Sequence, residues 1–160
     1  MTPQLLFGLS FVFGLLAWSV LAAQYLWPWL RTQSRTDALR ALLTVHTFRF
    51  LGLAFLVPGV VSPDLPTAFA HPAAFGDLVA AALALLAMAL LRGPVGVPLV
   101  WVFNVWGAGD LINAVYRGAQ SGLQAGQLGA AYFIPTFIVP LLLVTHVLIF
   151  MALLRRRSVP

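Results

Sequence analysis

The sequence predicts an all-α polytopic integral membrane protein, a bundle of five transmembrane helices in which residues 1–160 form a single transmembrane domain. Of the 160 residues, 61% are hydrophobic and 8% are charged, whereas soluble domains carry about 25% charged residues. So few charges cannot cover a water-exposed surface, and the predicted surroundings are therefore a lipid bilayer. Five apolar stretches reach the length of about 17–25 residues that a helix needs to cross the hydrocarbon core.

The five predicted helices span about residues 5–27, 41–60, 75–91, 97–116 and 131–154. The first stretch lacks a positively charged start and a clean small-residue cleavage site, so it is predicted to be a retained transmembrane helix rather than a signal peptide. The connection SPDLPTAFAHPAAFGD contains three prolines, which block a regular helix. We expect this connection to cover the helix ends or to dip into the outer leaflet. Pro135 and Pro140 predict a kink in the last helix.

The distribution of arginine predicts the orientation of the bundle, because cytoplasmic connections carry an excess of positive charge. All nine basic residues are arginine, and all four acids are aspartate. Seven arginines fall on one predicted side of the membrane: Arg31, Arg35, Arg40, Arg92, Arg155, Arg156 and Arg157. Arg117 falls on the other side, and Arg49 falls within the membrane. The N-terminus is thus predicted outside and the C-terminus inside, and the net charge of +5 reflects topology rather than nucleic-acid binding.

Polar residues inside the predicted helices are the candidates for a ligand or proton pocket, since such groups are costly in lipid and face the interior of a bundle. They are His46, Arg49, Asp77, Asn104, Asp110, Asn113 and His146. At a rise of about 1.5 Å per residue, the two histidines, Arg49 and Asn104 share one inner layer, roughly 8–12 Å deep, and the two aspartates lie further out. The first helix lacks such residues and is predicted to be peripheral.

Arg49 requires a counter-ion, because an unpaired guanidinium in hydrocarbon costs several kcal/mol. Asp110 is the predicted partner, with Asp77 as the alternative. Gly107 and Gly109 allow a close helix approach on the same segment as Asp110. Two interpretations stay open: the pair only locks two helices together, or it forms the charged floor of a pocket, where Arg49 would suit an anionic ligand such as a carboxylate or phosphate group.

The two histidines at matched depth allow three interpretations. They are hydrogen-bonded core residues, or they relay protons, or His46 and His146 are the axial ligands of a b-type haem, the one cofactor that the sequence allows. A zinc site is not predicted, because no third Cys, Asp or Glu ligand lies in their layer.

The sequence contains no G-x-S-x-G, H-E-x-x-H, P-loop or cysteine-pair motif, so no catalytic residue is assigned and a non-enzymatic role is favoured. The first functional hypothesis is a transporter, proton-linked carrier or membrane sensor, which requires a water-reachable cavity at the ionisable groups. The alternative is a structural or assembly subunit of a membrane complex. Either role is compatible with a homo-oligomer or another membrane partner.

Four stretches carry a resemblance to known sequences: FRFLGLAFL, LPTAFAHPAAFGD, WVFNVWGAGDLINAV and IPTFIVPLLLVTHVL. They resemble the run of motifs in a group of small uncharacterised bacterial multi-pass membrane proteins, over about residues 45–150. The resemblance implies a location in the bacterial inner (plasma) membrane and brings no activity with it. It also implies that Arg49, Asp77, Asn104, Asp110 and His146 belong to the shared pattern.

Overall fold

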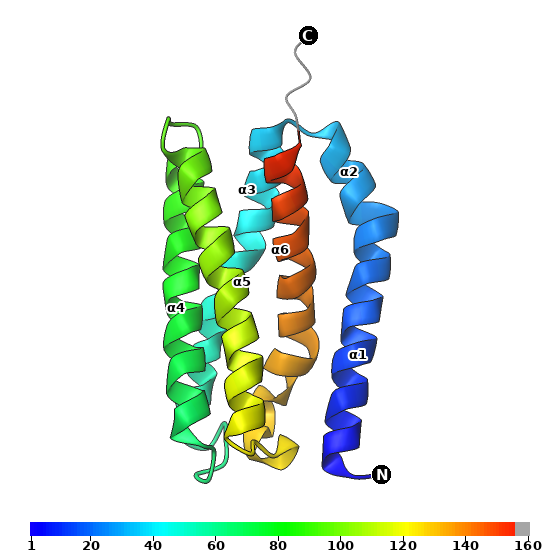
Figure 1. The fold of residues 1–160 in the computed structure, drawn as a ribbon, viewed down its shortest axis with the longest axis vertical. Helices are drawn as coiled ribbons and strands as arrows, with labels where there is room; N and C mark the ends of the chain where they lie inside the picture. Colours follow the sequence, from blue (N-terminus) through cyan, green and yellow to red (C-terminus); the bar gives the residue numbers. More distant parts are fainter. Residues whose placement is uncertain (156–160) are drawn as a thin grey trace.

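The computed structural model describes residues 1–155, and its long elements are all helices that run along one axis (Figure 1). The prediction of an all-α fold is confirmed: within the described range, the one β-type pairing is an isolated bridge between Pro58 and Val61. Arg156 and Arg157, which were counted on the predicted cytoplasmic side, lie outside the described residues.

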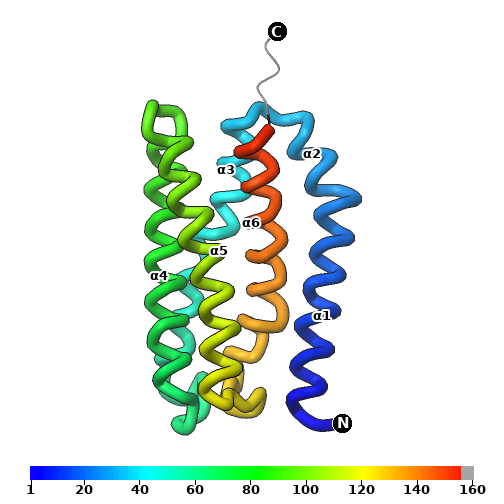
Figure 2. The backbone as a smooth tube through the Cα atoms, in the orientation of Figure 1, coloured from blue at the N-terminus to red at the C-terminus, as the bar shows by residue number. Residues whose placement is uncertain are grey.

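The elements follow in the order α1 (Pro3–Leu21), η1 (Ala22–Leu26), α2 (Trp27–Thr32), α3 (Arg35–His46), η2 (Thr47–Leu56), α4 (Thr67–Leu90), α5 (Gly96–Gln120), η3 (Ala125–Tyr132), η4 (Ile134–Ile138) and α6 (Val139–Leu154). Four continuous helical stretches are long and apolar enough to cross a membrane: 3–32, 35–56, 67–90 and 134–154. Helix α5 has 25 residues against 24 in α4, and the two lie side by side (Figure 2). Helix α5 is less apolar than α4, because it carries polar residues along its length.

The predicted loop after residue 61 is half helical, which corrects the sequence-based boundary. Helix α4 begins at Thr67 rather than near Phe75, and it contains Pro72 in its second turn. Pro72 lacks the N–H that would bond to the carbonyl four residues earlier, so α4 continues through this position with one hydrogen bond missing in its second turn. Pro66 occupies the N-cap position of α4. The longer α4 places Asp77 well inside the helix rather than at its start.

The second spanning stretch changes its winding at His46, where α3 passes into the 3₁₀-helix η2. A 3₁₀-helix has 3.0 residues per turn, so every third residue falls on one line. His46, Arg49, Gly52 and Phe55 obey this spacing, and all four are buried, whereas Phe48, Phe50 and Leu51 are exposed. The 3₁₀ winding thus stacks the ionisable residues of this stretch on the face that points into the bundle.

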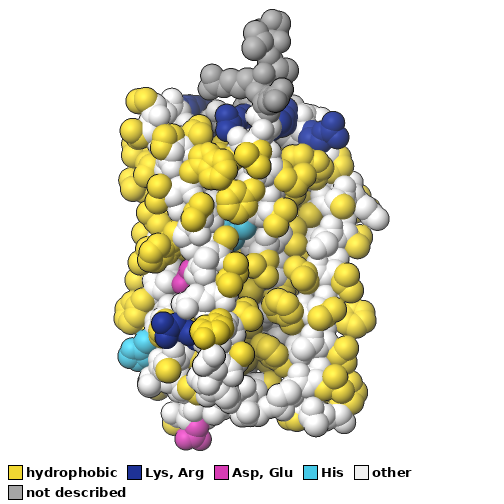
Figure 3. All heavy atoms as spheres, viewed as in Figure 1, with side chains coloured by type: hydrophobic (Ala, Val, Ile, Leu, Met, Phe, Trp, Pro, Cys, Tyr) yellow, Lys and Arg dark blue, Asp and Glu magenta, His cyan; other side chains and the backbone are white. Residues whose placement is uncertain are grey.

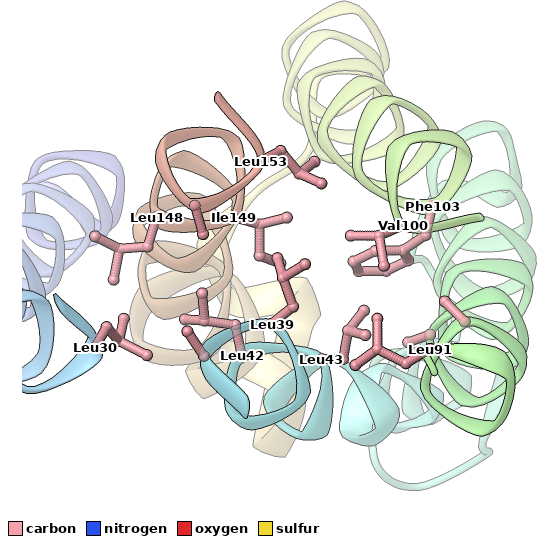
Figure 4. Packing of buried hydrophobic residues seen from close by; sticks show 14 of the residues in the cluster. Leu30, Leu39, Leu42, Leu43, Leu91, Val100, Phe103, Leu148, Ile149 and Leu153 are labelled. Atoms are coloured by element: carbon pink, nitrogen blue, oxygen red, sulfur yellow. The ribbon is translucent and has the colours of Figure 1, made fainter. Parts of the chain in front are cut away.

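Two apolar cores enclose the polar residues. One core contains leucines of α2, α3 and α6 with Val100 and Phe103 of α5 (Figure 4). The other is built around Phe55, Phe69, Leu128 and neighbouring residues of α4 and η3. Along each of the central helices, the order of residues is one core, then polar groups, then the other core. Along the long axis of the bundle, the polar cluster therefore lies between the two apolar cores.

Helix α1 lies at one side of the bundle, as predicted for the helix that lacks interior polar groups (Figure 1). It packs against η4 and α6. The indole Nε1 of Trp18 donates to the carbonyl of Phe137 at 3.0 Å, and the Tyr132 hydroxyl donates to Ser10 at 2.9 Å. Pro135 lies in the π-helix η4 and Pro140 lies in the first turn of α6, while the kink at these prolines stays a prediction.

Basic side chains gather at one end of the molecule. The start of α1 and the end of α6 lie at opposite ends (Figure 1). Basic side chains crowd the end at which α6 finishes, and the sides are largely hydrophobic (Figure 3). One acidic side chain is visible at mid-height among hydrophobic atoms.

Candidate functional site

Arg49 is the centre of a buried polar cluster and joins three other helices. Its Nε donates to Oδ1 of Asp77 on α4 at 2.7 Å, and its Nη2 donates to Oδ2 of Asp110 on α5 at 2.7 Å. Its Nη1 donates to the carbonyl of Gly107 at 3.0 Å and lies 3.3 Å from Nε2 of His146 on α6. The predicted alternatives for the counter-ion are therefore combined, because both aspartates pair with the one guanidinium.

Three glycines leave the space that this cluster occupies. A Cβ atom at Gly52 would collide with the Asp77 carboxylate, and one at Gly76 would collide with the Asp110 carboxylate. A Cβ at Gly107 would lie 2.7 Å from both Nη1 of Arg49 and Cε1 of His146. Each of η2, α4 and α5 thus contributes one small residue against an ionised side chain of another helix, and any larger residue would push the ion pairs apart.

The hydrogen bonds of His146 determine its protonation state. A guanidinium offers only donors, so Nε2 of His146 accepts from Arg49 and carries no proton. The proton is then on Nδ1, which donates to Oδ1 of Asn104 at 2.7 Å. The amide Nδ2 of Asn104 donates in turn to the backbone carbonyl of His146 at 3.3 Å. Asn104 therefore holds His146 as a neutral imidazole with a single tautomer.

His46 lies next to His146, with ring centroids 4.3 Å apart. Its Nε2 lies 3.0 Å from the hydroxyl of Thr145, which donates to carbonyls one turn earlier in α6, so Nε2 is the donor to Thr145. Its Nδ1 has no hydrogen-bond partner among residues 1–155. A charged imidazole here would bury an unsatisfied N–H group, so His46 is neutral as well.

The two histidines do not fit the haem that the sequence left open. Axial ligands point their nitrogens at an iron from opposite sides of a flat macrocycle, which separates their rings. Here the rings touch each other at 4.3 Å, and Phe103 packs against both of them. Nε2 of each ring is also engaged, by Thr145 and by Arg49. The placement of His46 and His146 therefore does not fit a bis-imidazole haem site.

With both aspartates ionised as partners of Arg49, the cluster carries an excess of negative charge. Arg49 contributes one positive charge, Asp77 and Asp110 contribute two negative charges, and the imidazoles contribute none. Each carboxylate uses one oxygen for Arg49, and the second oxygen has no hydrogen-bond donor among residues 1–155. The side chain of Arg49 is 0% exposed, whereas those of the two aspartates are each 10% exposed. The accessible side of the cluster is thus anionic.

A cavity of about 320 Å³ reaches the two carboxylates. It lies between α1, η2, α4, α5 and the segment around Pro135, and it contains few polar atoms besides the aspartates. Four phenylalanines contribute to its walls: Phe7, Phe11, Phe55 and Phe69. Its volume is in the range of small-molecule sites, which are typically apolar with a few placed polar groups.

Asp110 also lines a second, shallower hollow on the outside of the bundle, between α4 and α5. Gly76, Gly109 and Trp106 lie along this groove. Because Asp110 borders both spaces, it is the residue of the cluster that both the cavity and the outer face can contact.

Six of the seven predicted site residues come together in the structure: His46, Arg49, Asp77, Asn104, Asp110 and His146. Asn113 does not join them, since it is exposed and its Oδ1 accepts from Arg117 at 3.2 Å. The predicted separation into an inner and an outer layer is bridged by the long side chain of Arg49. Sequence reasoning missed Thr145 as the partner of His46, the roles of Gly52 and Gly76, and the aromatic walls of the cavity.

The fold and the site define a helical protein with helices apolar enough to span a membrane and a buried ionic cluster next to an apolar cavity. The chain belongs to the family described as a domain of unknown function (DUF8737), whose family model matches residues 6–154. This agrees with the resemblance to uncharacterised sequences, while the bacterial origin stays a prediction. No curated protein and no solved structure matches the chain.

Proposed function

We propose that this protein is a five-span protein of the bacterial inner membrane that binds a small solute or a proton at Asp77 and Asp110, as a carrier or a sensor. The opposite placement of the ends of α1 and α6 supports an odd number of crossings, with α5 as the fifth span (Figure 1). The basic side chains at the end where α6 finishes support a cytoplasmic C-terminus.

The observation that carries this proposal is the cavity whose polar floor is the pair Asp77 and Asp110. A purely structural ion pair is expected to be sealed on all sides, since water-filled space beside it weakens the attraction of the charges. Here the guanidinium is sealed and the carboxylates are open to the cavity. An ionisable group inside a membrane that faces a cavity is typical of solute and proton pathways.

A ligand screen on the purified protein tests this function. We expect at least one class of small solute to raise the unfolding temperature of the wild type in detergent, because a ligand of the native state stabilises it by mass action. Asp110→Asn should weaken the effect while leaving a balanced pair of Arg49 and Asp77. Asp64→Asn, at an exposed site, is the matched control.

Proton binding without a solute is tested in liposomes that contain a pH-sensitive dye. Proton flux under an imposed potential should be present for the wild type and lost in Asp110→Asn. The proposal is contradicted if no solute stabilises the protein and no flux is found.

A structural or assembly role is the second candidate, and the inner half of the cluster favours it. His46, Asn104, Thr145 and His146 are buried among helices and do not line the cavity. Such a network fixes the register of α3, α5 and α6, as buried polar groups do in some proteins. If this is the whole role, joint neutralisation of Arg49, Asp77 and Asp110 should leave assembly with a membrane partner intact in a co-purification assay.

A further inference from the structure

The cavity next to Asp77 and Asp110 offers different contacts to an anion and to a cation, and the inference from this difference rests on the proposed function. An anion finds no exposed donor there. Arg49 uses Nε, Nη1 and Nη2 in contacts with Asp77, Gly107, His146 and Asp110. Its side chain is 0% exposed, so an anion would meet carboxylates first. The sequence-based expectation of an anionic ligand for Arg49 is therefore not supported by these contacts.

A cation finds complementary groups in the same place. Each aspartate keeps one carboxylate oxygen without a hydrogen-bond donor among residues 1–155, and the cluster has one negative charge in excess. A positive group that approached Asp110 would balance that charge and strengthen the electrostatic contact in a medium with little water.

The aromatic walls of the cavity indicate which kind of uncharged group fits beside the carboxylates. Phe7 and Phe11 come from α1, Phe55 from η2 and Phe69 from α4, so rings from three elements border one space. Phe55 and Phe69 also pack edge to face, with centroids 5.3 Å apart, which holds both rings in place. Aromatic faces attract cations and also pack well against apolar groups. A volume of about 320 Å³ suits a compact molecule with one charged end.

We propose that the cavity binds a hydrophobic organic monocation, an amine or quaternary ammonium compound whose charged group contacts Asp77 and Asp110 and whose apolar body lies among the phenylalanines. Hydrated inorganic cations do not match this site, because it has too few oxygen ligands to replace their water. A neutral apolar molecule would fill the walls and leave the negative charge unbalanced.

Three compounds with the same apolar body test this inference: 4-phenylbutylamine, 4-phenylbutanol and 5-phenylpentanoate. Each is titrated into the purified wild-type protein in a non-ionic detergent, and the unfolding temperature is recorded. The amine should stabilise the protein most, then the alcohol, and the carboxylate least. In Asp110→Asn, the half-saturating amine concentration should rise about tenfold, since a charge-assisted contact is lost. Asp64→Asn should bind the amine as the wild type does.

The outcomes separate the inference from the proposed function. If the alcohol or the carboxylate stabilises the wild type as much as the amine, the inference is overturned and a solute site remains. If none of the three acts but another class of the screen does, the inference is also overturned and the function stands. If the order of the three compounds is as expected but the amine effect is unchanged in both Asp110→Asn and Asp77→Asn, the cation binds elsewhere and the inference fails.

Discussion

Nη1 of Arg49 lies 3.3 Å from Nε2 of His146, and this contact makes the imidazole an acceptor. The positive charge of the guanidinium therefore excludes a second positive charge at His146, and Nδ1–H of His146 donates to Oδ1 of Asn104 at 2.7 Å. Since neither histidine offsets the two aspartates, the negative excess of the cluster is a direct consequence of how Arg49 and His146 meet.

The tautomer of His146 should depend on Asn104. We expect Asn104→Leu to lower the free energy of unfolding by about 1–3 kcal/mol, because Nδ1–H of His146 would stay buried without an acceptor. Asn113→Leu, on the same helix but exposed, should change it by less than about 0.5 kcal/mol. Denaturing-detergent titrations measure both values. A ¹⁵N-detected spectrum of the labelled wild type should show His146 protonated at Nδ1, and a proton at Nε2 would contradict the network.

Arg49 should tolerate no replacement without a loss of stability. Arg49→Met leaves two buried carboxylates without a counter-ion and should cost about 3–5 kcal/mol in unfolding free energy. Arg49→Lys should cost less, but it cannot restore the wild type, since a single ammonium cannot reach both carboxylates, the Gly107 carbonyl and His146 together. The same titration measures these losses.

A triple variant provides the internal check on that loss. Adding Asp77→Asn and Asp110→Asn to Arg49→Met should recover part of the stability, because the uncompensated charges are removed. Arg117→Met, at an exposed arginine, is the control and should behave as the wild type. A triple variant that is less stable than Arg49→Met would show that charge balance does not govern this site.

Two glycines of α5 give a pair of matched variants, because Gly107 lies against Arg49 and His146 whereas Gly109 faces open space. Gly107→Ala should destabilise the protein by about 1–3 kcal/mol through overpacking, because its Cβ would lie 2.7 Å from Arg49 Nη1 and His146 Cε1. Gly109→Ala meets no atom within 4 Å and should be neutral or slightly stabilising, since alanine favours helix over glycine. Thermal unfolding of both variants measures the difference, and equal stabilities would rule out the close approach at Gly107.

The proposed topology can be read by cysteine labelling, because the natural chain contains no cysteine. Gly93→Cys lies in the connection between α4 and α5, and Gln120→Cys lies at the far end of α5. In intact cells, an impermeant thiol reagent should label Gln120→Cys, and Gly93→Cys should react after the membrane is opened. Labelling of both from the same side would show that α5 does not cross the bilayer.

Much of the fold could be predicted from the sequence, because apolar length and intramembrane polar residues have few structural solutions. The helical class, the peripheral first helix and the grouping of Arg49 with both aspartates and His146 all follow from the cost of polar groups in lipid. The start of α4 could not be predicted, since Pro66 and Pro72 indicate an interruption, whereas Pro66 is the N-cap and α4 continues through Pro72 with one hydrogen bond missing.

The finer geometry of the site could not be predicted, because it depends on how the helices wind and pack, and the spacing of polar residues in the sequence does not show either. Asn113 falls on the same heptad-like face as Asp110 in sequence, yet it is exposed because that face is wider than the buried strip. The switch to 3₁₀ winding after His46 has no clear marker in the sequence, and it decides that Arg49, Gly52 and Phe55 share one line. The closeness of the two imidazoles, which excludes a haem between them, follows from that packing.

We infer that the cavity that ends at Asp77 and Asp110 is anionic and is reached by water. Ala114→Cys places the only thiol in that cavity, and Ile112→Cys places it two residues away on the exposed face of α5. In membranes, Ala114→Cys should react with a trimethylammonium methanethiosulfonate faster than with the anionic sulfonate analogue, and Asp110→Asn should remove that preference. Ile112→Cys should be unreactive toward both. Equal inertness of the two thiols, or a faster reaction of Ala114→Cys with the anionic reagent, would contradict the claim.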